Sequence, residues 1–259
     1  MVEVETLFSD ILEAERDIYI FTPPGFGDDP GRRYPVLYMQ DGQNIFSGEG
    51  TWHIRWDVDG TATRLIRRGK IEELMIVGVA NSEWRDDEYT PTVDQGEESG
   101  GAADPYLRFL IEEVKPYIDA NYPVRPFRED TGIAGSSLGG LLSLYAAMTY
   151  PEYFGKVAAM SPSLWWDDHV ILKMAAEWEI DPADLKIWVD MGFFEDDPEE
   201  AEETDVDPLE EADALCEILK AKGFRRGRNL RYYEDKGGTH DEIAWGRRFD
   251  KVLRFLFKA

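Results

Sequence analysis

Residues 131–140 read Thr-Gly-Ile-Ala-Gly-Ser-Ser-Leu-Gly-Gly, and an apolar run follows them as far as residue 148. The apolar start predicts a short strand over 131–135, and the run 138–148, which is apolar nearly all round, predicts a buried helix. The turn between them matches the G-x-S-x-G pattern, in which a sharp strand-to-helix turn exposes a serine hydroxyl at the carboxyl end of a strand. This stretch therefore predicts an α/β sheet with Ser137 as a candidate nucleophile at its edge.

The glycines beside Ser137 are what the chemistry of a serine nucleophile requires. A serine hydroxyl is a weak nucleophile, so it needs a neighbouring base, an oxyanion hole and unhindered access. Gly135 and Gly139 allow the turn and the close packing of helix on strand, whereas Ser136 occupies the variable position and is expected to point elsewhere. A glycine-rich turn without catalytic function is the alternative, and the strand before it and the buried helix after it favour the nucleophile.

Outward from this stretch, short β-rich runs alternate with longer helical patterns, which is typical of a mostly parallel sheet with helices on both faces. We expect one α/β domain of the α/β-hydrolase class over residues 1–259, because no break in composition divides the chain. Two polar segments, 81–104 and 191–207, are expected to be long loops that form lids or are disordered. The predicted strands are 17–21, 35–40, 74–80, 156–160, 185–190 and 230–233, and the predicted helices are 107–118, 208–222 and a C-terminal helix.

The composition excludes several classes of function. With 43% hydrophobic residues the chain can form a core, but its 53 acidic and 28 basic residues give a net charge of −25, which argues against binding nucleic acid or anionic membranes. This excess resembles adaptation to high intracellular salt. Cys216 is the one cysteine, so no internal disulfide can form, and no run of 18 apolar residues occurs. A cytoplasmic monomer or homodimer is expected.

The base has three candidates, since the chain contains only His53, His169 and His240. His240 ends the motif Gly-Gly-Thr-His, immediately after the final predicted strand and before the C-terminal helix. The order serine, acid, histidine in α/β-hydrolases requires the base at this point of the chain. His240 is therefore the predicted base, and the other two are interpreted as ordinary surface or pocket residues.

The third residue of the triad is a carboxylate that orients the histidine, and it is expected just after the strand 185–190. Several carboxylates follow this strand, and we rank Glu195 first because it lies beyond the glycine turn with enough reach. Asp190 is second, because at the strand end it could instead fix the loop, and Asp196 and Asp197 come last. Metal-binding and dinucleotide-binding motifs are absent from the sequence, so no metal or cofactor is expected.

Several stretches together resemble the esterase family of α/β-hydrolases that includes enterochelin-type siderophore esterases and feruloyl esterases. The resemblance implies catalysis by Ser137 and His240, with an acid from the loop 192–195. It also implies an oxyanion hole made by the backbone N–H groups of Leu138 and of the segment around Gly42, which follows a predicted strand as such a donor should. The matching stretches are 33–46, 88–91, the serine turn, 161–166 and 237–240.

The predicted activity is hydrolysis of a small-molecule ester through an acyl-enzyme, with an aryl, siderophore-type or sugar ester as substrate. The same residues could instead serve an acyltransferase, and a non-catalytic binding protein of this fold is a further alternative. Aromatic residues in loops near the strand ends could form a flat wall for substrate or pack as core or lid, and an arginine there could meet an anionic group or pair with a carboxylate. The expected substrate-binding residues are Trp52, Arg85, Tyr89, Trp165 and Trp166.

Overall fold

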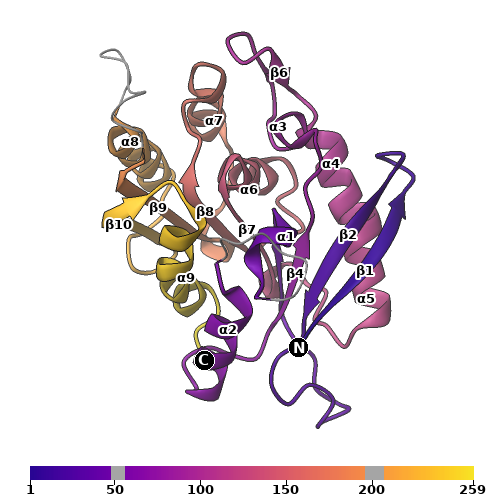
Figure 1. Ribbon diagram of the computed structural model, residues 1–259. Coiled ribbons are helices and arrows are strands. Elements are labelled where there is room, and N and C mark those ends of the chain that lie inside the picture. Colours follow the sequence, from indigo (N-terminus) through magenta and orange to yellow (C-terminus); the bar gives the residue numbers. More distant parts are fainter. Residues whose placement is uncertain (48–55, 196–206) are drawn as a thin grey trace.

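An eight-stranded sheet runs through the computed structural model, which describes residues 1–47, 56–195 and 207–259 (Figure 1). Its strands lie in the order β1-β2-β4-β3-β7-β8-β9-β10, and a separate two-stranded hairpin joins β5 to β6. The strands are β1 (Val2–Ser9), β2 (Ala14–Phe21), β3 (Val36–Met39), β4 (Met75–Val79), β5 (Val93–Asp94), β6 (Ser99–Gly100), β7 (Thr131–Ser137), β8 (Lys156–Pro162), β9 (Lys186–Phe194) and β10 (Leu230–Thr239).

The sheet is parallel from β4 to β10, and only β1 and β2 run antiparallel to their neighbours. Parallel strands end at one shared edge, so the residues that follow β3, β7, β8, β9 and β10 come together there. Strands β3 and β4 are buried along their whole length, which explains why their sequences are continuously apolar, and β7 is buried up to Ser136. The sheet thus gathers segments that are distant in sequence at one edge.

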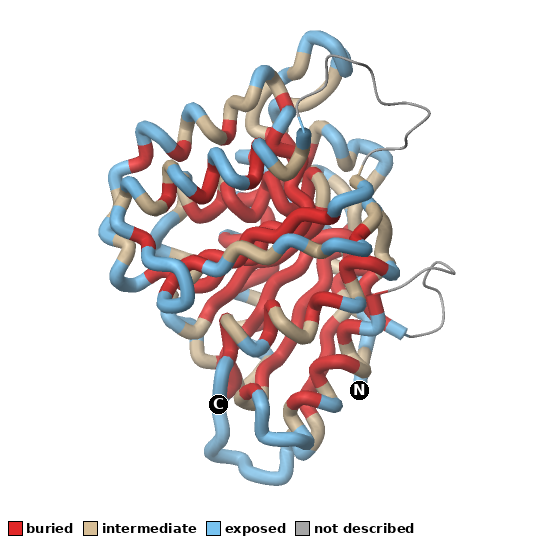
Figure 2. The backbone as a smooth tube through the Cα atoms, turned by 90° about the vertical axis from the view of Figure 1, so that its left-hand side faces the viewer, coloured by how far each residue is buried: buried red, intermediate tan, exposed pale blue. Residues whose placement is uncertain are grey.

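Helices cover both faces of the sheet, and each face has its own apolar core. One core packs α4, α6, α7 and α8 on the sheet, and the other packs α1, α2 and α9 on the opposite face; Figure 2 shows the buried strands between these layers. The helices are α1 (Gly42–Ile45), α2 (Val58–Arg67), α3 (Arg85–Glu88), α4 (Ala103–Phe109), α5 (Lys115–Asn121), α6 (Leu138–Thr149), α7 (Trp166–Glu177), α8 (Pro208–Ala221) and α9 (Glu242–Leu256), with a π-helical turn over Leu110–Val114 and short 3₁₀ turns at Arg128–Asp130 and Pro182–Asp184.

The mostly parallel sheet with helices on both faces is confirmed, and so is the buried helix α6 after the serine turn. Edge strand β1 was not predicted, although its alternating acidic and apolar residues carry the period of a strand. The prediction of a long loop over 81–104 was wrong, because this segment contains α3 and the β5–β6 hairpin. Helices α2 and α7 were also missed.

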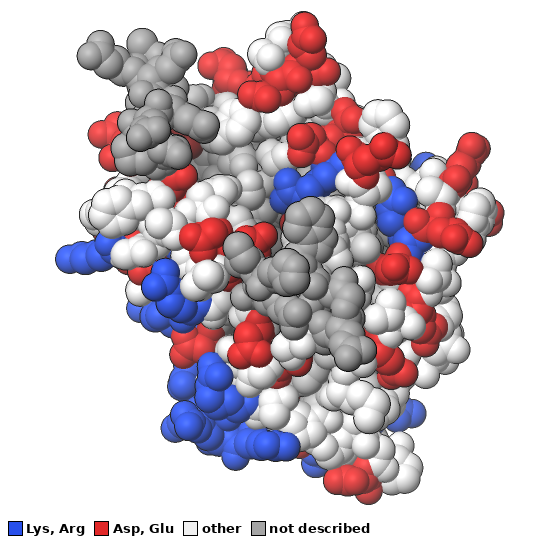
Figure 3. All heavy atoms as spheres, in the orientation of Figure 1, with Lys and Arg blue, Asp and Glu red and all other residues white. Residues whose placement is uncertain are grey.

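The surface in Figure 3 is strongly acidic, in keeping with the net charge, although basic side chains gather at its lower left, at the α2 end of the molecule. Within residues 1–47, 56–195 and 207–259, no helix has both the length and the apolar character needed to cross a membrane.

Candidate active site

The serine turn is strained in the way a nucleophile elbow requires. Ser137 closes β7 with φ 57° and ψ −128°, a conformation that a non-glycine residue rarely adopts, and α6 begins at the next residue. A Cβ atom on Gly135 would lie 2.4 Å from Gln40 Oε1 and 2.6 Å from the carbonyl carbon of Gly139. The first glycine of the motif is therefore needed for the strand and the helix to approach each other.

The hydroxyl of Ser137 opens into a pocket at the carboxyl edge of the sheet. Its Oγ lies 3.3 Å from Ser163 Oγ. Among the described residues, Ser163 is the hydrogen-bond partner of the Ser137 hydroxyl. Ser136, expected to point elsewhere, is buried but also contributes to the pocket wall. His240 lines the same pocket, so the nucleophile and the predicted base share one cavity.

His240 pairs with Glu195 across the ends of β9 and β10. Its Nδ1 lies 2.7 Å from Glu195 Oε2, and its ring meets the edge of Trp245 with centroids 5.1 Å apart. Burial raises the pKa of the Glu195 carboxyl, but hydrogen bonds with His240 and Ser161 outweigh burial and leave this pKa below its ordinary value. Glu195 is therefore held as a carboxylate against the imidazole.

Two glycines bring the chain close enough for this contact. A Cβ atom on Gly192 would lie 2.4 Å from Glu195 Oε1 and 2.5 Å from the carbonyl oxygen of Gly238. The N–H of Gly192 donates a hydrogen bond to the same carboxylate oxygen. The ends of β9 and β10 thus fit together around Glu195 only because neither glycine has a side chain.

Asp190, the second candidate for the acid, has other partners. It is fully buried, its Oδ2 accepts a hydrogen bond from Trp188 Nε1 at 2.6 Å, and its Oδ1 lies 2.9 Å from Arg248 Nη2 and accepts the N–H of Ser161. Asp190 therefore fixes the interior behind the site. Asp196 and Asp197, the remaining candidates, lie outside the described residues.

The pocket has two parts, which meet at His240. The larger part has a volume of about 380 Å³. The smaller part, about 190 Å³, lies beside Glu195. The larger part is lined by Asp41, Gln43, Asn44, Trp56, Asn81, Arg85, Ser136, Ser137, His240, Glu242 and Trp245, and the smaller by Ser161, Pro162, Ser163, Trp165, Met191, Glu195, Pro208, Glu211 and His240.

Two of the expected substrate-binding residues reach this pocket. Trp165 is 46% exposed and lines the smaller part. Arg85 lines the larger part, but its guanidinium forms a bidentate ion pair with Asp41. Nε lies 2.8 Å from Oδ1 and Nη2 lies 3.0 Å from Oδ2. Arg85 is thus tied to a carboxylate that shares the pocket wall. Trp52 lies outside the described residues.

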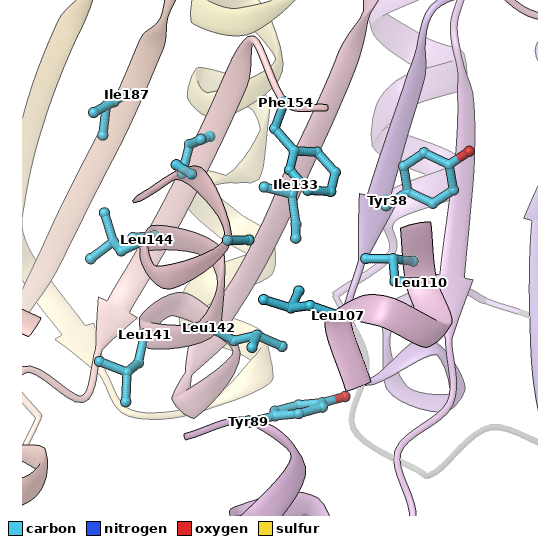
Figure 4. Packing of buried hydrophobic residues seen from close by; sticks show 14 of the residues in the cluster. Tyr38, Tyr89, Leu107, Leu110, Ile133, Leu141, Leu142, Leu144, Phe154 and Ile187 are labelled. Atoms are coloured by element: carbon cyan, nitrogen blue, oxygen red, sulfur yellow. The ribbon is translucent and has the colours of Figure 1, made fainter. Parts of the chain in front are cut away.

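The interpretation of Tyr89 and Trp166 as substrate-contacting residues was wrong. Tyr89 is completely buried, and Figure 4 shows its ring in the core with Leu107 and Leu142. Its hydroxyl accepts the backbone N–H of Asp41 at 3.1 Å, so it supports the pocket wall from behind. Trp166 is 2% exposed and donates its indole N–H to the carbonyl of Thr92. Both aromatic rings therefore pack in the apolar core and do not face the pocket.

The two backbone segments expected to form the oxyanion hole begin helices at the same edge of the sheet. Leu138 is the first residue of α6, directly after the nucleophile, and Gly42 is the first residue of α1, after β3. The residues on either side of Gly42 line the pocket. A Cβ atom on Gly42 would lie 2.6 Å from the carbonyl carbon of Gly78, so glycine lets α1 pack against β4.

Four residues that build the site were not predicted from the sequence. Ser163 faces the candidate nucleophile, Ser161 and Arg248 lie behind Glu195, and Trp245 donates a hydrogen bond to Ser161. The two serines belong to the stretch 161–166, which matched the family but suggested no role for them. Trp245 was expected only as part of the apolar face of the C-terminal helix. Of the other two histidines, His169 pairs with Glu211 at 2.7 Å, and the position of His53 lies outside the described residues.

Comparison with known proteins places the chain within one family. The family model described as "Putative esterase" matches residues 9–256. The chain is 26% identical to YbbA of Bacillus subtilis over 93% of this chain and 92% of that protein. It is also 26% identical to the iron(III) enterobactin esterase of Escherichia coli, over 72% of this chain but only 44% of that protein. The solved structure of a ferulic acid esterase matches with a TM-score of 0.75 at 23% identity, covering 99% of this chain and 98% of that one, which supports the α/β-hydrolase fold.

Proposed function

The chain belongs to the esterase family of α/β-hydrolases, and from this premise we propose that it hydrolyses carboxylic esters through an acyl-enzyme on Ser137. The observation that carries the proposal is the 2.7 Å contact between His240 Nδ1 and Glu195 Oε2, beside a pocket that Ser137 also lines. These residues are a nucleophile, a base and an orienting acid in the chain order of this fold.

In the first half of the reaction, His240 acts as general base. Because the Glu195 carboxylate can only accept a hydrogen bond, it selects the tautomer with the proton on Nδ1, which leaves Nε2 free to take the proton of Ser137. The hydroxyl exchanges its contact with Ser163 for one with His240 when substrate binds, since catalytic hydrogen bonds often tighten only in the complex. Ser137 Oγ then attacks the acyl carbon, and the departing alcohol takes the proton from His240.

In the second half, water attacks the acyl-enzyme and gives its proton to the same nitrogen of His240, which returns it to Ser137 as the acid leaves. Negative charge develops on the carbonyl oxygen in both halves. We assign the backbone N–H groups of Leu138 and Gly42 as its hydrogen-bond donors, because both begin helices at the edge where Ser137 lies. One such donor typically contributes about 3 kcal/mol to the transition state.

The two parts of the pocket favour an ester with one flat, apolar group and one polar group. Trp165, Met191 and Pro162 give the smaller part walls suited to an aryl acyl group. Gln43 and Asn81 in the larger part hydrogen-bond to each other, and each amide keeps a second N–H that can donate to a hydroxylated alcohol. An aryl acyl group also agrees with the name of one structural neighbour, a ferulic acid esterase.

The test is hydrolysis of a short alkyl ester and of a hydroxycinnamoyl ester by the wild type, Ser137→Ala and a control. Ser9→Ala is the control, because Ser9 is a buried serine at the end of β1 whose hydroxyl accepts the backbone N–H of Leu12 and lies outside the pocket. Loss of the nucleophile should lower turnover by about six orders of magnitude. Equal rates for Ser137→Ala and the wild type would contradict the proposal.

A further inference from the structure

A buried hydroxyl lies behind the acid of the candidate triad. Ser161, near the end of β8, is 1% exposed, and its Oγ lies 2.7 Å from Glu195 Oε1. The residue adopts φ 38°, in the region that favours glycine. Such strain at a serine persists only where the surroundings hold it in place, and it is most common at functional sites.

The direction of the Ser161 proton follows from counting its hydrogen bonds. A hydroxyl has one proton to donate and two lone pairs to accept with. Trp245 Nε1 donates to Ser161 Oγ at 3.1 Å, and Arg248 Nη2 donates to the same oxygen. Both lone pairs are occupied by groups that can only donate, so the one proton of Ser161 points at Glu195.

Arg248 is itself fixed in one orientation. The side chain is 1% exposed, its Nη2 lies 2.9 Å from Asp190 Oδ1, and its Nη1 lies 3.4 Å from Asp235 Oδ2. Asp190 also accepts the backbone N–H of Ser161 at 3.1 Å. Backbone and side chain of Ser161 are therefore held by the same buried ion pair.

This arrangement divides the two oxygens of Glu195 between two tasks. Oε1 accepts from Ser161 and from the N–H of Gly192, which leaves Oε2 for His240. We propose that Ser161 is a positioning residue, which fixes the rotation of the Glu195 carboxylate and thereby the orientation of His240. This inference rests on the proposed function.

Removal of the Ser161 hydroxyl should change how strongly Glu195 stabilises the imidazolium. Among the described residues, the charged or titratable groups that face Glu195 are His240, Asp190 and Arg248, whose Nη2 lies 3.7 Å from Oε1. Without the hydroxyl, Nη2 keeps Asp190 as an acceptor but loses Ser161, so the N–H that Ser161 accepted is free to bond to Oε1. The carboxylate then turns toward the arginine, and a cation shares its charge. Glu195 then stabilises the imidazolium that forms during catalysis less well.

The experiment compares Ser161→Gly and Ser161→Ala with the wild type and Ser9→Ala, on the ester that the wild type hydrolyses best. Both site variants delete the hydroxyl, but glycine also relieves the strain at φ 38°, so it keeps the test valid if alanine folds poorly. We expect both to lower kcat by about ten- to a hundred-fold with KM unchanged, as losses of supporting hydrogen bonds do in metal sites. The acid limb of kcat/KM should also move to lower pH.

A kcat and an acid limb equal to the wild type in folded Ser161→Gly would overturn the inference, and so would a change confined to KM. The proposed function is tested separately by Ser137→Ala. An inactive Ser137→Ala together with an unaffected Ser161→Gly would refute only the positioning role, whereas an active Ser137→Ala would refute the serine mechanism itself.

Discussion

The proposed nucleophile and the proposed acid of this site are built in opposite ways. Ser137 owes its strained conformation to a short stretch of chain, since Gly135 and Gly139 pack against each other within five residues. Glu195 is held by groups from β8, β9, β10 and α9, which lie up to 87 residues apart in sequence. A local turn can therefore be recognised from sequence, whereas a site assembled from many segments becomes visible only when they meet at the sheet edge.

The largest effect is expected from replacing Glu195 by Gln. This substitution tests the acid, which is held by several distant segments. The amide can donate to His240, favours the wrong tautomer and cannot stabilise the imidazolium, so kcat/KM for an ester should fall by about 10⁴-fold. Glu217→Gln, at an exposed glutamate of α8 paired with Lys220, is the control and should leave the rate unchanged. A loss of less than tenfold in Glu195→Gln would show that the triad does not depend on this carboxylate.

Arg248→Met tests whether the buried ion pair holds the acid region together. The substitution leaves Asp190 buried with no cation, so the free energy of unfolding in urea should fall by about 3–5 kcal/mol. The double variant with Asp190→Asn should recover part of this loss, because no charge is then left uncompensated. If the single and double variants unfold at the same urea concentration, the pair does not carry the stability assigned to it.

Gly135→Ala tests the local half of the comparison. The added Cβ would come within 2.4 Å of Gln40 Oε1 and 2.6 Å of the Gly139 backbone, so the unfolding free energy should fall by about 1–3 kcal/mol. Gly237→Ala is the control, because a Cβ there meets no atom within 4 Å. Equal urea midpoints for the two variants would mean that the elbow tolerates the methyl group.

The smallest expected effect is a pH dependence of stability that comes from Glu195. Its folded-state pKa lies below the ordinary value of 4.5, so the ionised carboxylate stabilises the native state above that pH, and the contribution is lost as pH falls through the folded pKa. The difference in unfolding free energy between the wild type and Glu195→Gln should therefore shrink as the pH falls below 4.5. A difference that grows on acidification would contradict the lowered pKa.

The same contrast explains what the sequence could predict. Apolar runs predicted the parallel sheet and α6, and the glycine spacing predicts Ser137 as the nucleophile, because each signal is local. Tyr89 and Trp166 were misassigned because loop position does not tell which side of the backbone an aromatic ring faces. The roles of Ser161 and Arg248 had no sequence signal, since their partners lie in other strands and helices.

The most direct test of the serine mechanism is covalent labelling with a fluorophosphonate, followed by mass spectrometry of the peptides. One adduct per chain is predicted, on Ser137, with no adduct in Ser137→Ala. An adduct on another residue, or none in the folded wild-type protein, would contradict the assignment of Ser137 as the nucleophile.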